Sequence, residues 1–357
     1  MYKKILSAFL TFTLILCLAA CSGGDPTVEE TSTPSVVEPP KPVFFANNLT
    51  GIENLTEEQT KLRPIAIMIN NINVAQEVQA GVQNADIVYE TEVEGGITRL
   101  MAVFKDVSAL GNIGTIRSAR YPYIELALGH DAIYTHHGQD ATYAAPYLSS
   151  SGVADFRIGE PYAFRHKNGK AYEHTLYSTG EKILKGIEAK GFRTTTEKTA
   201  NFANFRKEAD CTAPSYAQAL TAEVKFSNYA TSIFTYNEQT GLYTKNSKAR
   251  NNKDYFTGDT YSFKNVFILA TSISAYPDGY HMRVDLESGT GYYMSAGGYE
   301  PIRWVKGAGS ASFKFYAQDG SELQVNAGNS YVCIHKNSFS PVFTGPAPEE
   351  TTSSVAQ

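Results

Sequence analysis

The first half of the chain alternates short apolar runs with segments of helical pattern. Residues 63–70, RPIAIMIN, form a continuous apolar run after a proline, which is typical of a strand buried on both faces. Residues 88–104 and 132–138 indicate further strands. Helices are expected in four places, at residues 74–81, 122–129, 141–150 and 180–191. Because strands and short helices alternate, residues 43–200 are predicted to form an N-terminal α/β domain with a mixed sheet.

The pattern changes after about residue 220. Apolar and aromatic residues then alternate with polar ones between turn signals, as in EVKFSNYATSIFTYN and HMRVDLESGTGYYMS. This pattern predicts a mostly antiparallel β domain over residues 222–340, joined to the first domain by a linker at 201–221. The fold class expected for the whole chain is therefore α+β.

Both ends of the chain differ from this pattern. Residues 1–20 carry a basic start and an apolar run too short for a comfortable membrane span, and they end in small residues before Cys21. This is the pattern of a lipoprotein export signal with Cys21 as the lipidated residue; an ordinary secretory signal or an uncleaved anchor is the alternative. Each of the three places the rest of the chain outside the cytoplasm. A lipid on Cys21 would hold the protein at the outer face of the cytoplasmic membrane.

The composition predicts a disordered tether and a disordered tail, and it places few other constraints on function. Residues 21–42 and 341–357 are rich in Pro, Ser, Thr and Glu and are expected to be disordered. The net charge of −5 and the lack of a basic tract give no indication of nucleic-acid binding. Cys211 and Cys333 remain for the folded part, where they are either paired or separate thiols. Without metal-ligand spacing or a phosphate-binding glycine loop, no cofactor and no metal are expected.

Residues 88–104, VYETEVEGGITRLMAVF, place three glutamates at alternate positions before two glycines. A two-residue turn at 95–96 predicts a hairpin in which Glu92 faces Arg99 and Glu90 faces Met101. Glu90, Glu92, Glu94 and Arg99 then share one face. Two environments are compatible with this array: a solvated face, or a partly buried face with additional cations or a metal nearby.

Two arginines follow in GTIRSARYP. Arg117, Ser118 and Arg120 precede the helix expected at residue 122, whose start attracts anions, and arginine forks onto carboxylates or phosphates. Either these arginines pair with the glutamates, or one braces the site while another contacts a ligand. The candidate ligand-binding residues are Arg99, Arg117, Ser118, Arg120 and Glu92.

Histidines supply the catalytic alternative. His136 and His137 end a predicted strand, at the edge where open α/β sheets bind ligands. Alternation directs the two rings to opposite faces, so only one of them could form a metal or acid/base cluster with Asp140 and His174, and a histidine hydrogen-bonded in a polar pocket fits the spacing better. The catalytic candidates are Glu90, Glu94, His136 and His174.

A family resemblance follows from several of these motifs taken in order. NNLTG, RPIAIMINN, ADIVYETEVEGGITRLMAVF, GTIRSAR, DAIYTHHG, EHTLYS, TGDTYSFKNV and GTGYYMSAGGYEPIRWVK resemble the YerB-like lipoproteins over residues 44–336. The resemblance implies a two-domain, membrane-anchored, extracytoplasmic protein typical of Gram-positive-type bacteria, without an established activity.

Three functions are compatible with the sequence. The first is binding of an anionic envelope component, a peptidoglycan fragment or glycan, through the Arg/Glu site. The second is an envelope hydrolase or transferase that uses Glu90 or Glu94 with a histidine. The third is a scaffold for envelope proteins at the membrane surface.

Overall fold

A single sheet of eleven strands runs through both halves of the chain in the computed structural model. The structure describes residues 42–248 and 250–345. The strand order is β12-β22-β21-β18-β25-β4-β5-β3-β7-β8, with β23 paired to β22. In sequence order these strands are β3 (Ile65–Asn70), β4 (Ile87–Glu94), β5 (Ile97–Phe104), β7 (Ile133–His136), β8 (Ala154–Arg157), β12 (Ala217–Gln218), β18 (Asn265–Thr271), β21 (Ser288–Ser295), β22 (Gly298–Val305), β23 (Lys314–Tyr316) and β25 (Ser330–Lys336).

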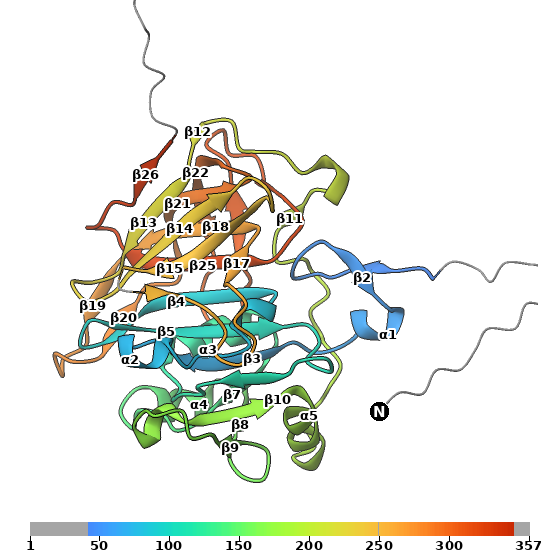
Figure 1. Cartoon of the computed structure of the whole chain (residues 1–357), viewed down its shortest axis with the longest axis vertical. Helices are drawn as coiled ribbons and strands as arrows, with labels where there is room; N and C mark the ends of the chain where they lie inside the picture. Colours follow the sequence, from blue (N-terminus) through green and yellow to red (C-terminus); the bar gives the residue numbers. More distant parts are fainter. Residues whose placement is uncertain (1–41, 249, 346–357) are drawn as a thin grey trace, which may run out of the picture. The chain divides into compact units, whose positions relative to one another are not determined.

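The two halves meet where β4 pairs with β25 in parallel. The pairing runs from Ile87 opposite Ser330 to Thr91 opposite Ile334, and we call it the central junction. Figure 1 shows the two strands side by side where the blue-green half meets the orange-red half. β25 is also parallel to β18, whereas β18, β21, β22 and β23 pair in antiparallel fashion. The predicted fold class is confirmed: a mixed N-terminal sheet is followed by a mostly antiparallel C-terminal half.

A second sheet packs on the C-terminal half. It has the order β16-β15-β14-β13-β26, with β17 paired to β15. Its strands are β13 (Thr221–Lys225), β14 (Thr231–Asn237), β15 (Leu242–Ser247), β16 (Arg250–Asn251), β17 (Ser262–Phe263) and β26 (Val342–Thr344). Smaller sheets join β1 (Phe45–Ala46) to β2 (Glu53–Leu55), β6 (Asn112–Gly114) to β10 (Leu176–Thr179) and β9 (Phe164–Arg165), β11 (Asn204–Phe205) to β24 (Gln324–Val325), and β19 (Ile273–Ala275) to β20 (Met282–Val284).

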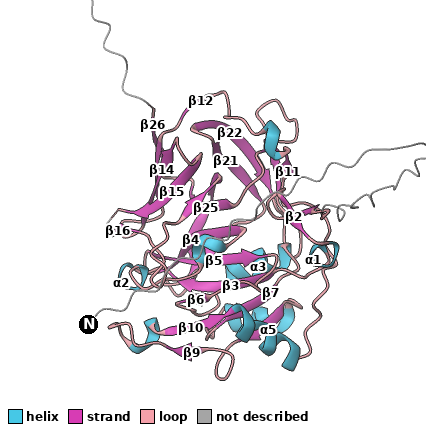
Figure 2. Ribbon diagram, turned by 45° about the vertical axis from the view of Figure 1, so that its right-hand side comes forward, coloured by secondary structure: helices cyan, strands magenta, loops and turns pink. Residues whose placement is uncertain are grey.

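Helices gather around the N-terminal strands (Figure 2). The α-helices are α1 (Glu57–Thr60), α2 (Asn73–Gln76), α3 (Tyr121–Gly129), α4 (Ala144–Ser150) and α5 (Gly180–Ala189), and short 3₁₀ turns span Val82–Asn84, Tyr172–His174 and Glu208–Asp210. α3 has proline in its first turn, which suits a position whose N–H has no helical partner. The helix expected at 74–81 is a single turn that ends at Gln76, and Gly81 takes a left-handed conformation at the start of the following 3₁₀ turn.

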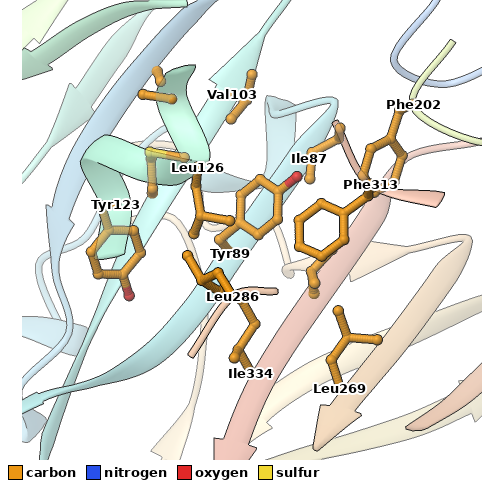
Figure 3. Close-up of a cluster of buried hydrophobic side chains, with 14 of the residues drawn as sticks. Ile87, Tyr89, Val103, Tyr123, Leu126, Phe202, Leu269, Leu286, Phe313 and Ile334 are labelled. Atoms are coloured by element: carbon orange, nitrogen blue, oxygen red, sulfur yellow. The ribbon is translucent and has the colours of Figure 1, made fainter. Parts of the chain in front are cut away.

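Both faces of the large sheet are buried, each by a different layer. One cluster joins Tyr89, Met101 and Val332 to side chains of α3 and α4, and Figure 3 shows Tyr123 and Leu126 of α3 beside Tyr89. The other cluster joins Val88, Leu100 and Cys333 to α5 and to strands of the second sheet. α3 and the second sheet therefore cover opposite faces of β4.

Several predictions from the ends of the chain lie outside the described residues. These are the export signal at 1–20, the lipidated Cys21, nearly all of the tether at 21–42, and residues 346–357 of the tail. In residues 42–248 and 250–345, no helix has the length and apolar character needed to cross a membrane.

Within residues 201–221, β11 and β12 each pair with a strand of the C-terminal half. Cys211 and Cys333 are separate free thiols.

Acid should destabilise the fold through His130, which follows α3. The Tyr89 hydroxyl lies 2.7 Å from Nε2 of His130. Burial, with the nearby charges of Lys198 and Lys306, lowers the pKa of His130 to about 3. Protons therefore bind the unfolded chain first as pH falls below about 6.5, so the stabilisation is complete at pH 7.5 and declines toward pH 3. We predict that the unfolding free energy of the wild-type protein falls by about 2 kcal/mol more than that of His130→Gln when the pH is lowered from 7.5 to 5. Urea titrations at the two pH values measure this difference. An unchanged pH dependence would contradict this role.

Candidate ligand-binding site

The predicted hairpin forms, but its register differs from the expectation. Gly95 and Gly96 have φ of 55° and 78°, left-handed values that a two-residue turn requires. Glu94 faces Ile97 and Glu92 faces Thr98, so Val93 is an extra residue in a β-bulge. As a result Glu90 faces Leu100, and Thr91 takes the place opposite Arg99. The predicted pairs Glu92–Arg99 and Glu90–Met101 were therefore wrong.

The bulge directs Glu94 toward Arg99 and the start of α3. Nη2 of Arg99 donates to Oε1 of Glu94 at 2.7 Å. Arg120 donates twice to the same carboxylate, from Nε at 2.7 Å and from Nη2 at 2.6 Å. The two guanidinium groups also donate to the carbonyl oxygens of Ser118 and Ala119, at 3.1 and 2.8 Å. Glu94 is 3% exposed, so the partly buried alternative for the glutamate array is the correct one at this position.

The charges in this network do not balance locally. Burial raises the pKa of Glu94, but the hydrogen bond from Arg120 and the charges of both arginines outweigh it and leave the pKa below its ordinary value. Burial lowers the pKa of Arg99 to about 10, and the like charges of Arg120 and Arg117 contribute. Three guanidinium groups thus face two carboxylates, Glu94 and, beside Arg117, Glu173. We call Arg99, Arg117 and Arg120 around Glu94 the arginine cluster.

Arg117 is the member of the cluster with the fewest protein contacts. Its backbone N–H bonds to the carbonyl of Met68, which places it near the carboxyl end of β3. Its Nη1 lies 3.4 Å from the carbonyl oxygen of Glu173, a long hydrogen bond. Burial lowers the pKa of Arg117, and the charge of Glu173 opposes that effect. Arg117 and Ser118 are both partly exposed, so they remain accessible to a ligand, while Arg99 and Arg120 are held by Glu94.

Glu90 lies on the opposite face of β4 from Glu94. Its Oε1 accepts hydrogen bonds from Asn71 and Thr98, both at 2.8 Å. Its Oε2 accepts from Ser232 of β14 at 2.7 Å and from the Tyr331 hydroxyl of β25 at 2.6 Å. Glu90 therefore ties the central junction to the second sheet. The two carboxylates do not flank a common space, which a glycosidase pair requires.

Glu92 also has a structural partner. Its Oε2 lies 2.7 Å from Nζ of Lys336, at the end of β25. Glu92 is 3% exposed and does not hold Arg99. It is the second carboxylate that connects β4 to the C-terminal half.

The candidate histidines do not join Glu90 or Glu94. Nδ1 of His136 lies 2.7 Å from the carbonyl oxygen of Gly138 and Nε2 lies 2.5 Å from Asp155. His174 pairs through Nδ1 with Asn70 at 2.8 Å, and burial lowers its pKa. Asp140 accepts hydrogen bonds from the backbone at the start of α4. Within residues 42–248 and 250–345, no group of three His, Cys, Asp or Glu side chains is placed to hold a metal.

A groove of about 770 Å³ lies between α3, α4 and the β19–β20 hairpin. Four tyrosines line it, Tyr121, Tyr143, Tyr147 and Tyr276, and we call it the tyrosine groove. The rings of Tyr143 and Tyr276 are stacked with centroids 3.8 Å apart, and those of Tyr121 and Tyr147 are 4.5 Å apart. Because Tyr143 precedes α4 and Tyr276 belongs to the C-terminal hairpin, both halves of the chain build this groove.

Polar groups complete the tyrosine groove. Glu125, 7% exposed, accepts a hydrogen bond from Tyr147 at 2.5 Å and another from the Gly309 N–H at 2.7 Å, so it fixes that wall. Arg283, Asp285 and Glu287 also line the groove and are exposed. Aromatic faces combined with carboxylates and one guanidinium offer both stacking and hydrogen bonding.

The arginine cluster adjoins this groove. Arg120 directly precedes Tyr121, and the backbone of Glu94 bridges to His281 of the β19–β20 hairpin. Figure 1 shows the hairpin beside the end of β4. Glu94 is therefore linked to α3 through Arg120 and to the hairpin through its backbone.

The four tyrosines were not among the candidate residues expected from the sequence. Tyr143 and Tyr147 are four residues apart, a spacing that places side chains on one helical face, and this was the available signal. Tyr121 and Tyr276 lie far apart in sequence and meet only through the fold. In contrast, Tyr293 and Trp304 from the aromatic-rich strands are buried in the core.

Comparisons with known proteins support the resemblance found in the sequence. Residues 49–193 match the family model "Protein of unknown function (DUF3048) N-terminal domain", and residues 222–332 match the C-terminal domain of the same family. The chain belongs to the DUF3048 family. It is 30% identical over 246 residues to "Putative lipoprotein YerB" of Bacillus subtilis (strain 168), covering 68% of this chain and 72% of the relative.

A solved structure of a relative has the same fold. The crystal structure of YerB from Bacillus subtilis matches with a TM-score of 0.72 and 26% identity, over 84% of this chain and 99% of that one. The relative's name indicates a lipoprotein, in agreement with the signal pattern before Cys21. Neither comparison assigns an activity.

Removal of the Glu94 charge should destabilise the protein strongly. Glu94→Gln leaves Arg99 and Arg120 buried without their counter-ion, and loss of one partner from a buried ion pair typically costs about 3–5 kcal/mol. Urea unfolding at neutral pH measures this loss. The matched control is Glu92→Gln, which should cost less because the side chain of Lys336 is 23% exposed and can turn to solvent. Equal losses in the two variants would contradict a central role for Glu94.

Proposed function

We propose that this protein is anchored by a lipid on Cys21 at the outer face of the cytoplasmic membrane and binds an anionic, glycan-containing component of the cell envelope. A peptidoglycan fragment has the required chemistry, because it combines sugar rings with carboxylates. The observation that carries the proposal is the tyrosine groove, which two halves of the chain build next to a cluster of arginines.

The groove supports the glycan part of the ligand. Sugar rings present C–H faces that pack on aromatic rings, and their hydroxyl groups donate to carboxylates. The stacked pair Tyr143 and Tyr276 offers the aromatic surface, and Asp285 and Glu287 offer acceptors. The volume of about 770 Å³ lies within the range of ordinary ligand sites.

The arginine cluster supports the anionic part. Glu94 holds Arg99 and Arg120, and their surplus charge raises the positive potential around Arg117 and Ser118. Arg117 is then the residue expected to contact a carboxylate of the ligand, with Ser118 donating a hydroxyl hydrogen bond. Arg120 takes a bracing role, because three of its N–H groups are bound within the protein.

We predict that single substitutions Tyr143→Ala and Tyr276→Ala each weaken binding of a disaccharide-peptide from peptidoglycan at least fivefold. An aromatic contact contributes about 1 kcal/mol, which corresponds to this factor. Titration calorimetry on the chain from Ser22 onward measures the affinity. Tyr216→Ala is the matched control, because Tyr216 is 61% exposed and does not line the groove.

A second comparison separates the charge from the stacking. Arg117→Gln should weaken binding of the anionic disaccharide-peptide but leave binding of a neutral tetramer of N-acetylglucosamine unchanged. The tyrosine variants should weaken both ligands. If the wild-type protein binds neither ligand, or if the tyrosine variants bind like wild type, the proposal fails.

A further inference from the structure

A second groove, of about 450 Å³, crosses four strands of the C-terminal half. The strand register sets Arg303 opposite Thr290, Thr290 opposite Ala270, and Ala270 opposite His335. Residues aligned in this way across a sheet project from the same face. Small residues in the middle leave a hollow between Arg303 and His335, and we call it the sheet groove.

His335 lines the sheet groove, and its ring forms no hydrogen bond within the described part of the chain. The residue is 2% exposed, and neither ring nitrogen has a partner among residues 42–248 and 250–345. Burial lowers the pKa of His335 to about 4, so the ring is neutral at ordinary pH, with one donor and one acceptor. Because a buried polar group without partners is costly, a ligand that pairs these nitrogens would be favoured in this groove.

The remaining lining defines the chemistry of that ligand. Arg303 is the one charged residue among those that line the groove; its guanidinium carbon lies 5.1 Å from the centre of the Tyr316 ring. In the described part of the chain Arg303 forms no ion pair. Amide, hydroxyl and apolar groups supply the rest: Thr290, Tyr292, Gln318, Asn337, Phe339 and Pro341.

We propose that the sheet groove binds a short peptide segment that carries a carboxylate. The carboxylate pairs with Arg303, and backbone groups at the other end, a C=O from one peptide unit and an N–H from another, pair with the two nitrogens of the neutral His335 imidazole. Three steps between neighbouring strands, at about 4.8 Å each, separate these two residues by about 14 Å, the length of about four extended residues. This site is separate from the tyrosine groove and does not depend on the function proposed above.

The test is an NMR titration of the chain from Ser22 onward with N-acetyl-tetra-alanine, whose C-terminus is a free carboxylate. The imidazole ¹⁵N resonances of His335 should shift to saturation as the peptide binds. The same peptide with an amidated C-terminus should bind at least tenfold more weakly. Arg303→Gln should reduce the affinity for the carboxylate peptide to that of the amide.

Two controls keep the outcome clear. Arg157→Gln alters an exposed arginine on β8, far along the sheet order, and should bind the peptide like wild type. His335→Phe removes the ring nitrogens that would bind the peptide and should weaken peptide binding. Circular dichroism checks that this variant folds. If it does not fold, the test relies on Arg303→Gln. No shift of the His335 resonances at millimolar peptide, equal affinity for acid and amide, or an unaffected Arg303→Gln variant would each overturn the proposal.

Discussion

The parallel pairing of β4 with β25 is the constraint on which the rest of this structure depends. It places a C-terminal strand in the middle of a sheet that begins with N-terminal strands, and both faces of β4 and β25 are then buried by other layers. Glu90 reinforces the pairing, because two of its four hydrogen bonds come from Tyr331 of β25 and Ser232 of the second sheet. The N-terminal and C-terminal domains of the family thereby share one continuous sheet. The β19–β20 hairpin is consequently held against α3 and α4, and the tyrosine groove forms between them.

Glu94 connects this framework to the candidate site. A β-bulge is what allows a glutamate on the buried strand to face the start of α3 while Val93 stays in the core. Burying one carboxylate with two arginines gains little stability over an apolar cluster, since desolvation opposes the Coulomb attraction. The network instead fixes positions: Arg120 is held beside Tyr121, and Arg117 lies within the influence of both Arg120 and Glu173. Functional sites often contain residues that the usual rules of burial disfavour, and this buried ionic network is such a case.

Local patterns predicted most of the elements, but long-range contacts decided the site. The apolar run at 65–70, the proline-led helix α3 and the glycine turn at 95–96 follow from periodicity and backbone preference, and the structure contains all three. The pairing of Glu92 with Arg99 failed because simple alternation has no means of indicating a bulge. His136 and His174 were separated because their partners, Asp155 and Asn70, come from elements that the sequence does not relate to them. Tyr276 could not be associated with Tyr143, since 133 positions separate them and only the central junction brings them together.

We propose that a glycan ligand occupies the groove between the two halves. Hydrogen–deuterium exchange of the chain from Ser22 onward, with and without the disaccharide-peptide, tests it most directly. We expect the ligand to slow exchange in α4 (Ala144–Ser150) and in the β19–β20 hairpin together, with smaller changes near Arg117. Protection confined to one wall, or protection elsewhere with both walls unchanged, would contradict it.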